Sequence, residues 1–241
     1  MIRILKSSLC SAKGYLEGEL IMNNVINVCG LYRGRLCFLA PEGQRTGIYK
    51  DSVASADVTA EGIVGDHQAD RRFHGGPEKA LHQYGQPSYE KIVSEFPELE
   101  GTAVPGSIGE NISSPFLTDA NVCIGDIYRL GGALVQVSQP RSPCWKINHK
   151  FGIQKLSLFI ERQRITGWYY RVLEAGKIQV DDEIELVECL NDGASIAHFL
   201  DVTKQHRPDL EALDALIRCD GLNPEWVARL KDRRAYLGAV S

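Results

Sequence analysis

Short apolar runs separated by glycine dominate the sequence between residues 25 and 190. Runs of this length with turn residues between them are typical of the strands of a β-barrel or a curled sheet. The runs 127–130 and 133–137 flank Gly131-Gly132, and a glycine pair in this position predicts a hairpin. Four further segments are predicted as strands: 25–39, 53–64, 178–180 and 184–187, the last two joined by a turn at Asp181-Asp182.

Helical spacing of apolar residues interrupts this pattern twice and then replaces it near the C-terminal end. The interrupting helices are predicted over 88–96, directly after Pro87, and over 153–164. Beyond residue 190 three helices are predicted: 194–203, 208–219 and 224–237. The predicted fold class is therefore mainly β with helices (α+β), with a β-barrel domain over 22–190 and a small three-helix C-terminal domain over 191–241 that leans on it.

Residues 1–21 have neither helical nor strand periodicity, and strand-like alternation starts only after Met22. The stretch Glu17-Gly18-Glu19 can be encoded by a purine-rich ribosome-binding sequence a few codons before Met22. One hypothesis is that Met22 is the true start and that 1–21 is a translated leader. The alternative is a short disordered or transit-like extension that begins at Met1.

Charge and hydropathy exclude two classes of partner. The 241 residues include 27 Lys and Arg against 31 Asp and Glu, a net charge of −4, which argues against broad binding to nucleic-acid phosphates. No run of about 18 uncharged apolar residues occurs, so no membrane-spanning helix is predicted. The seven cysteines are widely spaced and odd in number, and no C-x-x-C is present. Free thiols fit a reducing compartment, so a cytoplasmic location is expected.

The first candidate site is the segment from Gly62 to Leu81, which combines glycine with charged and polar residues. Backbone at Gly75-Gly76 can approach a ligand closely because no Cβ stands in the way. The flanking His74 and Lys79 are hydrogen-bonding or cationic groups suited to an anion. The alternative is a Gly-Gly-Pro turn with solvated charges.

A metal site in the same segment is a second interpretation. Asp66, His67, Asp70 and His74 are residue types that ligate hydrolytic metals, and the last three have the spacing of one helical face. The glycines on both sides of them favour a loop instead.

A second candidate segment, 106–112, holds two glycines followed by Glu110 and Asn111 between apolar flanks. Such a loop is able to place both side chains at the edge of a pocket. The alternative is a hairpin in which these polar side chains bond their own backbone.

The third candidate segment, 137–147, contains the cysteine with the most distinctive surroundings. An apolar strand runs into Pro140 and Pro143, which predict a rigid corner. Cys144 follows this corner, with Arg141 and Lys146 nearby, and cationic neighbours favour the thiolate that ligates metals or attacks substrates. The alternative is a packed, unreactive cysteine.

These segments together resemble one family. The run G-x-x-G-D…H-G-G-P-x-K-A-L over 62–81, G-E-N-I over 109–112, I-G-D over 124–126 and Q-P-R-S-P-C-W-K-I over 139–147 occur in the order found in the MOSC family (molybdenum cofactor sulfurase C-terminal domain). The similarity extends over about residues 25–240 and is greatest to the subgroup that protects cells from 6-N-hydroxylaminopurine. The resemblance implies a β-barrel with helices packed around it.

The resemblance also implies a cofactor, the molybdenum cofactor (molybdopterin). In this interpretation Cys144 is both the metal ligand and the catalytic residue, since a soft thiolate suits molybdenum. The resemblance implies that Arg141, His74 and Lys79 hold the anionic phosphate of the cofactor. The full set of positions expected to bind the cofactor is His74, Gly75, Gly76, Lys79, Glu110, Asn111, Arg141 and Ser142.

The expected activity is reduction of N-hydroxylated small molecules such as 6-N-hydroxylaminopurine. The sequence has no flavin, dinucleotide or iron–sulfur motif, so a separate flavin or iron–sulfur reductase is expected to donate the electrons. Two alternatives remain open: a sulfur carrier with a persulfide on Cys144, and a protein that only stores or delivers the cofactor.

Overall fold

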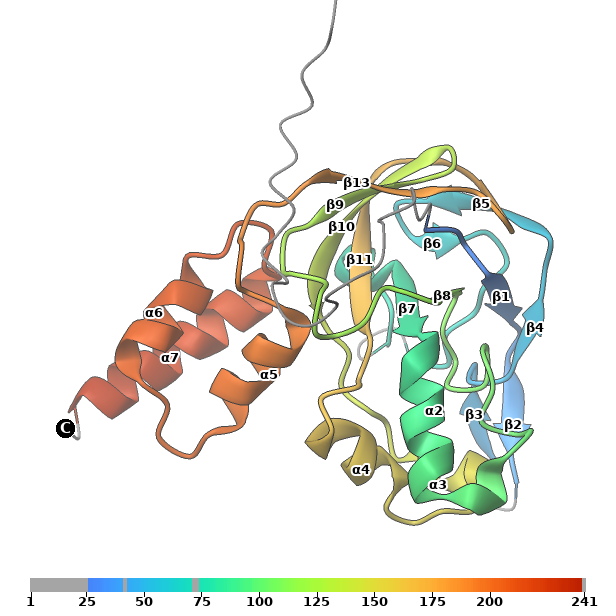
Figure 1. The fold of residues 1–241 in the computed structure, drawn as a ribbon, viewed down its shortest axis with the longest axis horizontal. Helices are drawn as coiled ribbons and strands as arrows, with labels where there is room; N and C mark the ends of the chain where they lie inside the picture. The colour runs from blue at the N-terminus through green and yellow to red at the C-terminus, as the bar shows by residue number, and fades with distance from the viewer. Residues whose placement is uncertain (1–25, 41–42, 71–73, 240–241) are drawn as a thin grey trace, which may run out of the picture.

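A computed structural model of the chain describes residues 26–40, 43–70 and 74–239. The hypothesis about the start at Met22 concerns residues outside these ranges, so it stays a hypothesis. The described chain forms one large mixed region of strands and helices with three further helices on one side of it (Figure 1).

The main sheet has eight strands, and its neighbours pair antiparallel except for one parallel pair, β7 with β8. In spatial order the strands are β13 (Ile184–Glu188), β9 (Ile127–Leu130), β10 (Ala133–Pro140), β11 (Trp168–Glu174), β7 (Leu81–Gly85), β8 (Ile112–Ser114), β1 (Gly30–Gly34) and β4 (Lys50–Ser52). The hairpin predicted around Gly131-Gly132 is confirmed, because β9 and β10 pair on either side of it.

Two smaller sheets complete the β-structure. They contain β12 (Gly176–Gln179), β5 (Ser55–Thr59) and β6 (Gly62–Ile63), and β2 (Cys37–Leu39) with β3 (Gln44–Thr46). The predicted turn at Asp181-Asp182 does not make a hairpin: β12 pairs with β5, whereas β13 pairs with β9. Asp181 has a φ of 71°, and at this turn the chain crosses from one sheet to the other.

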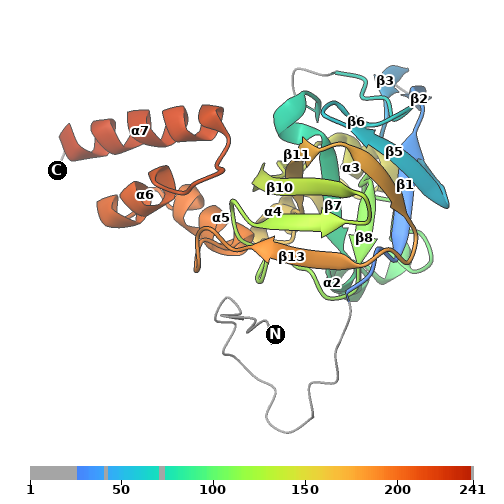
Figure 2. The ribbon, with the colours of Figure 1, turned by 90° about the horizontal axis from the view of Figure 1, so that it is seen from above.

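The expectation of a barrel is correct only in part. Figure 2 shows that the main sheet curls strongly from β13 round to β1. Among the described residues, however, no strand ladder joins its outer strands β13 and β4. The curl is completed only by an isolated bridge between Asn27 and Glu183 and by backbone hydrogen bonds of its neighbours, such as Val28 N to Asp182 O at 2.9 Å.

Helices cover two ends of this sheet. The first group is α2 (Gln86–Glu95), α3 (Lys146–Phe151) and α4 (Leu156–Arg162), with short 3-10 turns at Pro77–Lys79 and Pro97–Leu99. The second group, α5 (Ile196–Lys204), α6 (Leu210–Ile217) and α7 (Pro224–Ala239), lies beside the sheet at the left of both ribbon views, with α5 next to α4 in Figure 1 (Figures 1 and 2). The helix predicted over 153–164 is shorter than expected, and α3 was not predicted.

The buried residues form two clusters. The smaller one lies under α2, α3 and α4 and includes Tyr89, Ile147 and Ile160. The larger one is continuous from the sheet into the second helix group, where Phe199 and Leu213 are fully buried. Burial of apolar surface stabilises a fold by about 25 cal/mol per Å². This burial holds α5, α6 and α7 against the sheet. The division of the chain at residue 190 stays a prediction.

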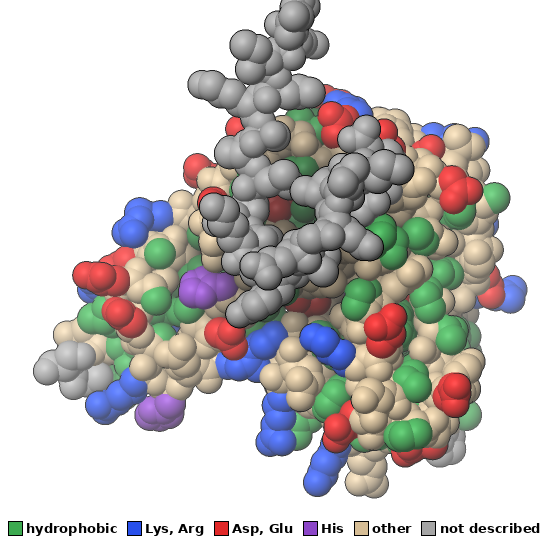
Figure 3. Space-filling view, viewed as in Figure 1, with side chains coloured by type: hydrophobic (Ala, Val, Ile, Leu, Met, Phe, Trp, Pro, Cys, Tyr) green, Lys and Arg blue, Asp and Glu red, His purple; other side chains and the backbone are tan. Residues whose placement is uncertain are grey.

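Side chains of both charge signs are interspersed with single hydrophobic side chains on the face that Figure 3 shows. Scattered apolar side chains are normal on a protein surface and by themselves indicate no binding site. Within the described residues, no helix is both long and apolar enough to cross a membrane.

Candidate functional site

Two adjoining cavities lie where the end of β10 meets the loops before β4 and β7. The inner cavity has a volume of about 80 Å³ and the outer one about 530 Å³. Four residues line both of them: His74, Cys144, Lys146 and Tyr169. The outer volume lies within the range of small-molecule sites, roughly 300–1,000 Å³.

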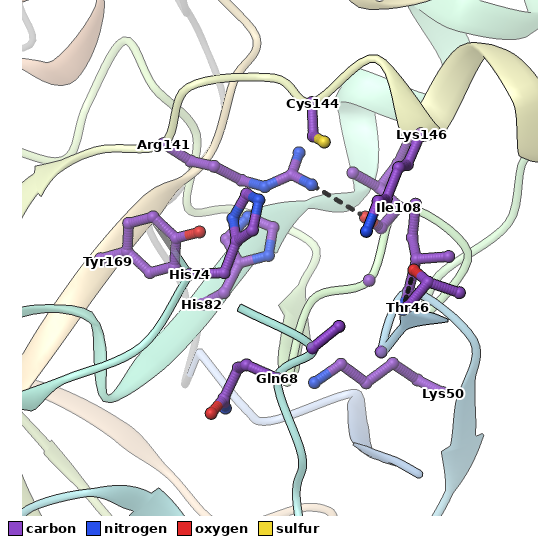
Figure 4. Close-up of a pocket in the computed structure, with 14 residues that line it drawn as sticks. Thr46, Lys50, Gln68, His74, His82, Ile108, Arg141, Cys144, Lys146 and Tyr169 are labelled. Carbon is purple, nitrogen blue, oxygen red and sulfur yellow. Dashed lines mark hydrogen bonds between the residues drawn. The ribbon is translucent and has the colours of Figure 1, made fainter. Parts of the chain in front are cut away.

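Cys144 lies at the junction of the two cavities. Strand β10 ends at Pro140, residues 141–145 form a loop without helix or strand, and α3 begins at Lys146. The prediction of a corner at this proline-containing segment is therefore confirmed. The Cys144 side chain is partly exposed and lies between Arg141 and Lys146 in the close-up of the inner cavity (Figure 4).

Arg141 is the most buried cation of the site, with 5% of its surface exposed. Its backbone N–H donates to the Gly167 carbonyl at 2.9 Å, and its Nη2 donates to the Ile108 carbonyl at 3.2 Å. Its Nη1 is buried and has no hydrogen-bond partner among the described residues. Figure 4 shows the guanidinium pointing into the cavity. A buried charged donor without an acceptor is costly, so Nη1 has an open hydrogen-bond position for a water molecule or a ligand.

Two histidines line the inner cavity, and both are held in the neutral form. Burial, with help from Arg141, Lys146 and Lys79, lowers the pKa of His74 to about 4. Burial, reinforced by Arg141, lowers the pKa of His82 well below its ordinary value. At neutral pH these rings therefore offer hydrogen bonds rather than positive charge. The sequence analysis missed His82, which lies on a strand whose five residues are all buried.

Lys50 and Asp66 form a buried ion pair at the floor of the inner cavity, and the sequence analysis missed Lys50 as well. Lys50 Nζ donates to the Asp66 carboxylate at 2.6 and 2.7 Å, and the two side chains are 5% and 1% exposed. Asp66 also accepts from the Gly34 N–H at 2.6 Å and from Asn111 Nδ2 at 3.0 Å. The carboxylate offsets the charge of Lys50, so Arg141 and Lys146 supply the net positive charge of the site.

This ion pair also bears on the interpretation of the segment 62–81 as a metal site. The Asp66 carboxylate is paired with Lys50. No group of three or more Asp, Glu, His or Cys among the described residues is arranged to hold a metal ion. A hydrolytic metal site at Asp66, His67, Asp70 and His74 is therefore not supported.

Asp66→Asn is expected to lower the free energy of unfolding by about 3–5 kcal/mol, because the buried ammonium of Lys50 loses its counter-charge. Asp51→Asn is the matched control, since the Arg35–Asp51 pair is solvent-exposed and 3.8 Å long, and its loss is expected to cost less than about 1 kcal/mol. Urea unfolding of both variants measures the difference. Equal losses in the two would contradict a structural role for the buried pair.

Glu110 and Asn111 do not line either cavity but lie buried behind them. Glu110 Oε1 accepts from Tyr89 Oη at 2.5 Å and from the Gly106 N–H at 2.6 Å, and burial raises the pKa of this carboxyl. Tyr89 Oη in turn accepts from the Ile108 N–H at 3.2 Å. Glu110 therefore fixes the loop whose Ile108 carbonyl holds Arg141.

Asn111 links two strands and the ion pair. Its Oδ1 accepts from the His82 N–H at 3.1 Å, and its Nδ2 donates to the Tyr32 carbonyl at 3.2 Å and to Asp66. Its position supports His82 and Asp66 from behind the inner cavity. The alternative, a hairpin whose polar side chains bond their own backbone, holds only for the Gly106 N–H to Glu110 bond, because the partners of Asn111 belong to other segments.

The remaining predicted residues surround the outer cavity or its rim. Lys79 and Ser142 line it, whereas Gly75 and Gly76 line neither cavity. Gly76 has a φ of 93° directly before the 3-10 turn, which is a conformational reason for glycine there. Three residues of α7, which the sequence analysis did not connect with the site, also line the outer cavity: Glu225, Trp226 and Arg229.

The two cavities and Cys144 together suit a ligand that has an anionic group at one end and a soft metal at the other. The inner cavity offers cationic and neutral hydrogen-bond donors to an anionic group such as phosphate. The thiol at the junction is a ligand for a soft metal. The outer cavity leaves room for a second molecule of moderate size next to that thiol.

Comparison with known proteins identifies the family of the chain. The family model for the MOSC domain matches residues 70–185. The protein YiiM of Escherichia coli (strain K12) is 38% identical over 202 residues, which are 80% of this chain and 87% of YiiM. The crystal structure of YiiM from Escherichia coli superposes with a TM-score of 0.73 and 31% identity, over 87% of this chain and 93% of the other.

A longer protein shares part of the chain. A protein named "Reductase" from Gibberella moniliformis (strain M3125 / FGSC 7600) is 40% identical over 131 residues, 54% of this chain but only 23% of that protein. The match to YiiM, by contrast, covers most of both chains. This chain therefore belongs to the MOSC family.

Proposed function

We propose that the protein binds the molybdenum cofactor and reduces N-hydroxylated compounds such as 6-N-hydroxylaminopurine. The observation that carries the proposal is the buried, unpartnered Nη1 of Arg141 beside Cys144, where a small cavity and a larger one adjoin. The reductase that shares about half of this chain supports an oxidoreductase role.

The residues present fit the cofactor. Arg141 would hold its phosphate, with His74 and His82 as neutral hydrogen-bonding groups in the same cavity. Lys79 and Ser142 would contact it from the outer side, and Cys144 would supply a thiolate to the metal. When bound, molybdenum supplies the chemistry that accepts an oxygen atom and passes electrons to and from a donor.

The reaction balances as a two-electron reduction. The N–O bond of the hydroxylamine breaks, two electrons and two protons are consumed, and the amine and water form. The electrons come from a separate flavin or iron–sulfur protein. Tyr169 lines both cavities, and because burial raises its pKa, its Oη keeps its proton and can donate a hydrogen bond to the leaving oxygen.

The outer cavity favours the reductase over the two alternatives. A sulfur carrier needs an exposed persulfide, and a storage protein needs only a cofactor site, whereas a reductase needs a second space for substrate. The cavity of about 530 Å³ next to Cys144 would hold the substrate beside the part of the cofactor that Lys79 and Ser142 contact.

Turnover by protein purified from a host competent for cofactor synthesis tests the proposal. With reduced methyl viologen as electron donor, 6-N-hydroxylaminopurine should be converted to adenine, measured by chromatography. Bound molybdenum without any turnover would indicate storage or delivery of the cofactor. Sulfur on Cys144 that cyanide releases as thiocyanate would indicate a sulfur carrier.

A further inference from the structure

The first two turns of α7 form a wall of the outer cavity, far along the chain from the other residues of the site. Glu225, Trp226 and Arg229 line this cavity together with Cys144 and Trp145. The MOSC domain match ends at residue 185, so the wall belongs to the part of the chain beyond it.

The start of α7 is attached directly to the strand that leads to Cys144. Asn223 is buried and donates its backbone N–H to the Ser138 carbonyl at 2.9 Å, while its Nδ2 donates to Gln139 Oε1. Its Oδ1 accepts from the Glu225 N–H at 2.8 Å. Ser138 and Gln139 lie near the end of β10, and β10 leads into the loop that contains Cys144. The position of the wall is therefore fixed relative to the thiol.

The ring of Trp226 is held from two sides. Its edge-to-face contact with Phe199 has a centroid distance of 5.1 Å and an interplanar angle of 89°. The Arg229 guanidinium lies over the indole at 5.6 Å from its centroid. Trp226 is only partly buried, so part of a well-positioned aromatic ring remains for a ligand in the cavity.

The chemistry of the wall favours a flat heteroaromatic ligand. Trp145, which precedes α3, contributes a second indole that is 42% exposed, and indole faces stack on planar bases. The Glu225 carboxylate accepts hydrogen bonds from ring or exocyclic N–H groups, and the Arg229 guanidinium donates to ring nitrogens. An aliphatic N-hydroxylated compound has no ring to stack on either indole.

We infer that Trp226 is a specificity-determining residue, which recognises the planar heteroaromatic part of the N-hydroxylated substrate while its N–O group lies toward Cys144. The inference rests on the proposed function for the identity of the reacting group. It assigns to α7 a direct part in substrate selection in addition to its packing against the sheet.

Kinetics with two substrates test the inference. For 6-N-hydroxylaminopurine, Trp226→Ala should raise KM by roughly five- to a hundredfold, the loss expected from removal of one stacking contact. The kcat should change little, and Trp226→Phe should recover most of the KM. For acetohydroxamic acid, which has no ring, all three proteins should have the same KM. Tyr236→Ala, on the exposed far end of α7, is the control that should resemble the wild type.

Two results would overturn the inference: an unchanged KM for the purine in Trp226→Ala, or an equal rise for both substrates with loss of molybdenum. If the wild type reduces neither compound, the proposed function fails, and calorimetric titration with 6-N-hydroxylaminopurine decides the inference separately. A Kd at least fivefold weaker in Trp226→Ala than in the wild type would then support Trp226 as the recognition residue. Equal Kd values, or no binding by either protein, would overturn it.

Discussion

Cys144→Ala is expected to lose bound molybdenum and, with it, all reduction of N-hydroxylated substrates. Cys144 is the cysteine that lines both cavities, and it lies between two cations where the small cavity adjoins the larger one. The substitution removes a sulfur ligand that no other residue of the two cavities supplies. Metal analysis and turnover of the purified variant measure the effect.

The fold should be unaffected by this substitution. Cys144 is partly exposed, and truncation of such a side chain changes the free energy of unfolding by about 1 kcal/mol or less. Cys29→Ala and Cys219→Ala are matched controls, because neither cysteine lines the inner or the outer cavity, and both should keep the molybdenum content of the wild type. Full retention of molybdenum by Cys144→Ala would refute its role as a ligand.

Arg141→Ala is expected to weaken retention of the cofactor roughly tenfold to a hundredfold, which corresponds to about 1.5–3 kcal/mol for a lost charge-assisted hydrogen bond. Arg141→Lys should have a partial effect, since lysine keeps the charge but lacks the planar pair of donors. The reason is the buried Nη1 of Arg141, which has no protein acceptor among the described residues, on a side chain that lines the inner cavity. Cofactor dissociation over time, followed by pterin fluorescence, measures the effect.

Arg141 also has a structural contact, through Nη2 and the Ile108 carbonyl, and melting temperatures separate the two roles. Arg141→Ala should lower the melting temperature of the cofactor-loaded protein more than that of the cofactor-free protein. Arg129→Ala, which breaks an exposed pair with Glu174, should affect both forms little. An equal decrease in both forms of Arg141→Ala would make Arg141 a structural residue only.

Local sequence predicted the parts of the fold that depend on local contacts. The β9–β10 hairpin follows from Gly131-Gly132, and α2, α5, α6 and α7 follow from apolar spacing and proline positions. The pairing of β12 with β5 and of β13 with β9 was not predicted, because partners far apart in the chain leave no local pattern. The same reason explains why closure of the barrel was overestimated.

The candidate site was predicted where the motifs contain charged or soft side chains. Cys144, Arg141 and His74 do converge on one cavity. Lys50 and His82 were missed because a short strand and a fully buried strand have no alternating pattern that marks a polar residue as exceptional. Trp226 was missed because only the tertiary packing of α7 brings it to the outer cavity.

Molybdenum and pterin analysis of the protein purified from a host competent for cofactor synthesis tests cofactor binding most directly. Wild-type protein should carry near-stoichiometric molybdenum together with pterin, and Cys144→Ala prepared in parallel should carry background levels of the metal. Wild-type protein without molybdenum or pterin, from a preparation in which a known molybdoenzyme is fully loaded, would contradict the account.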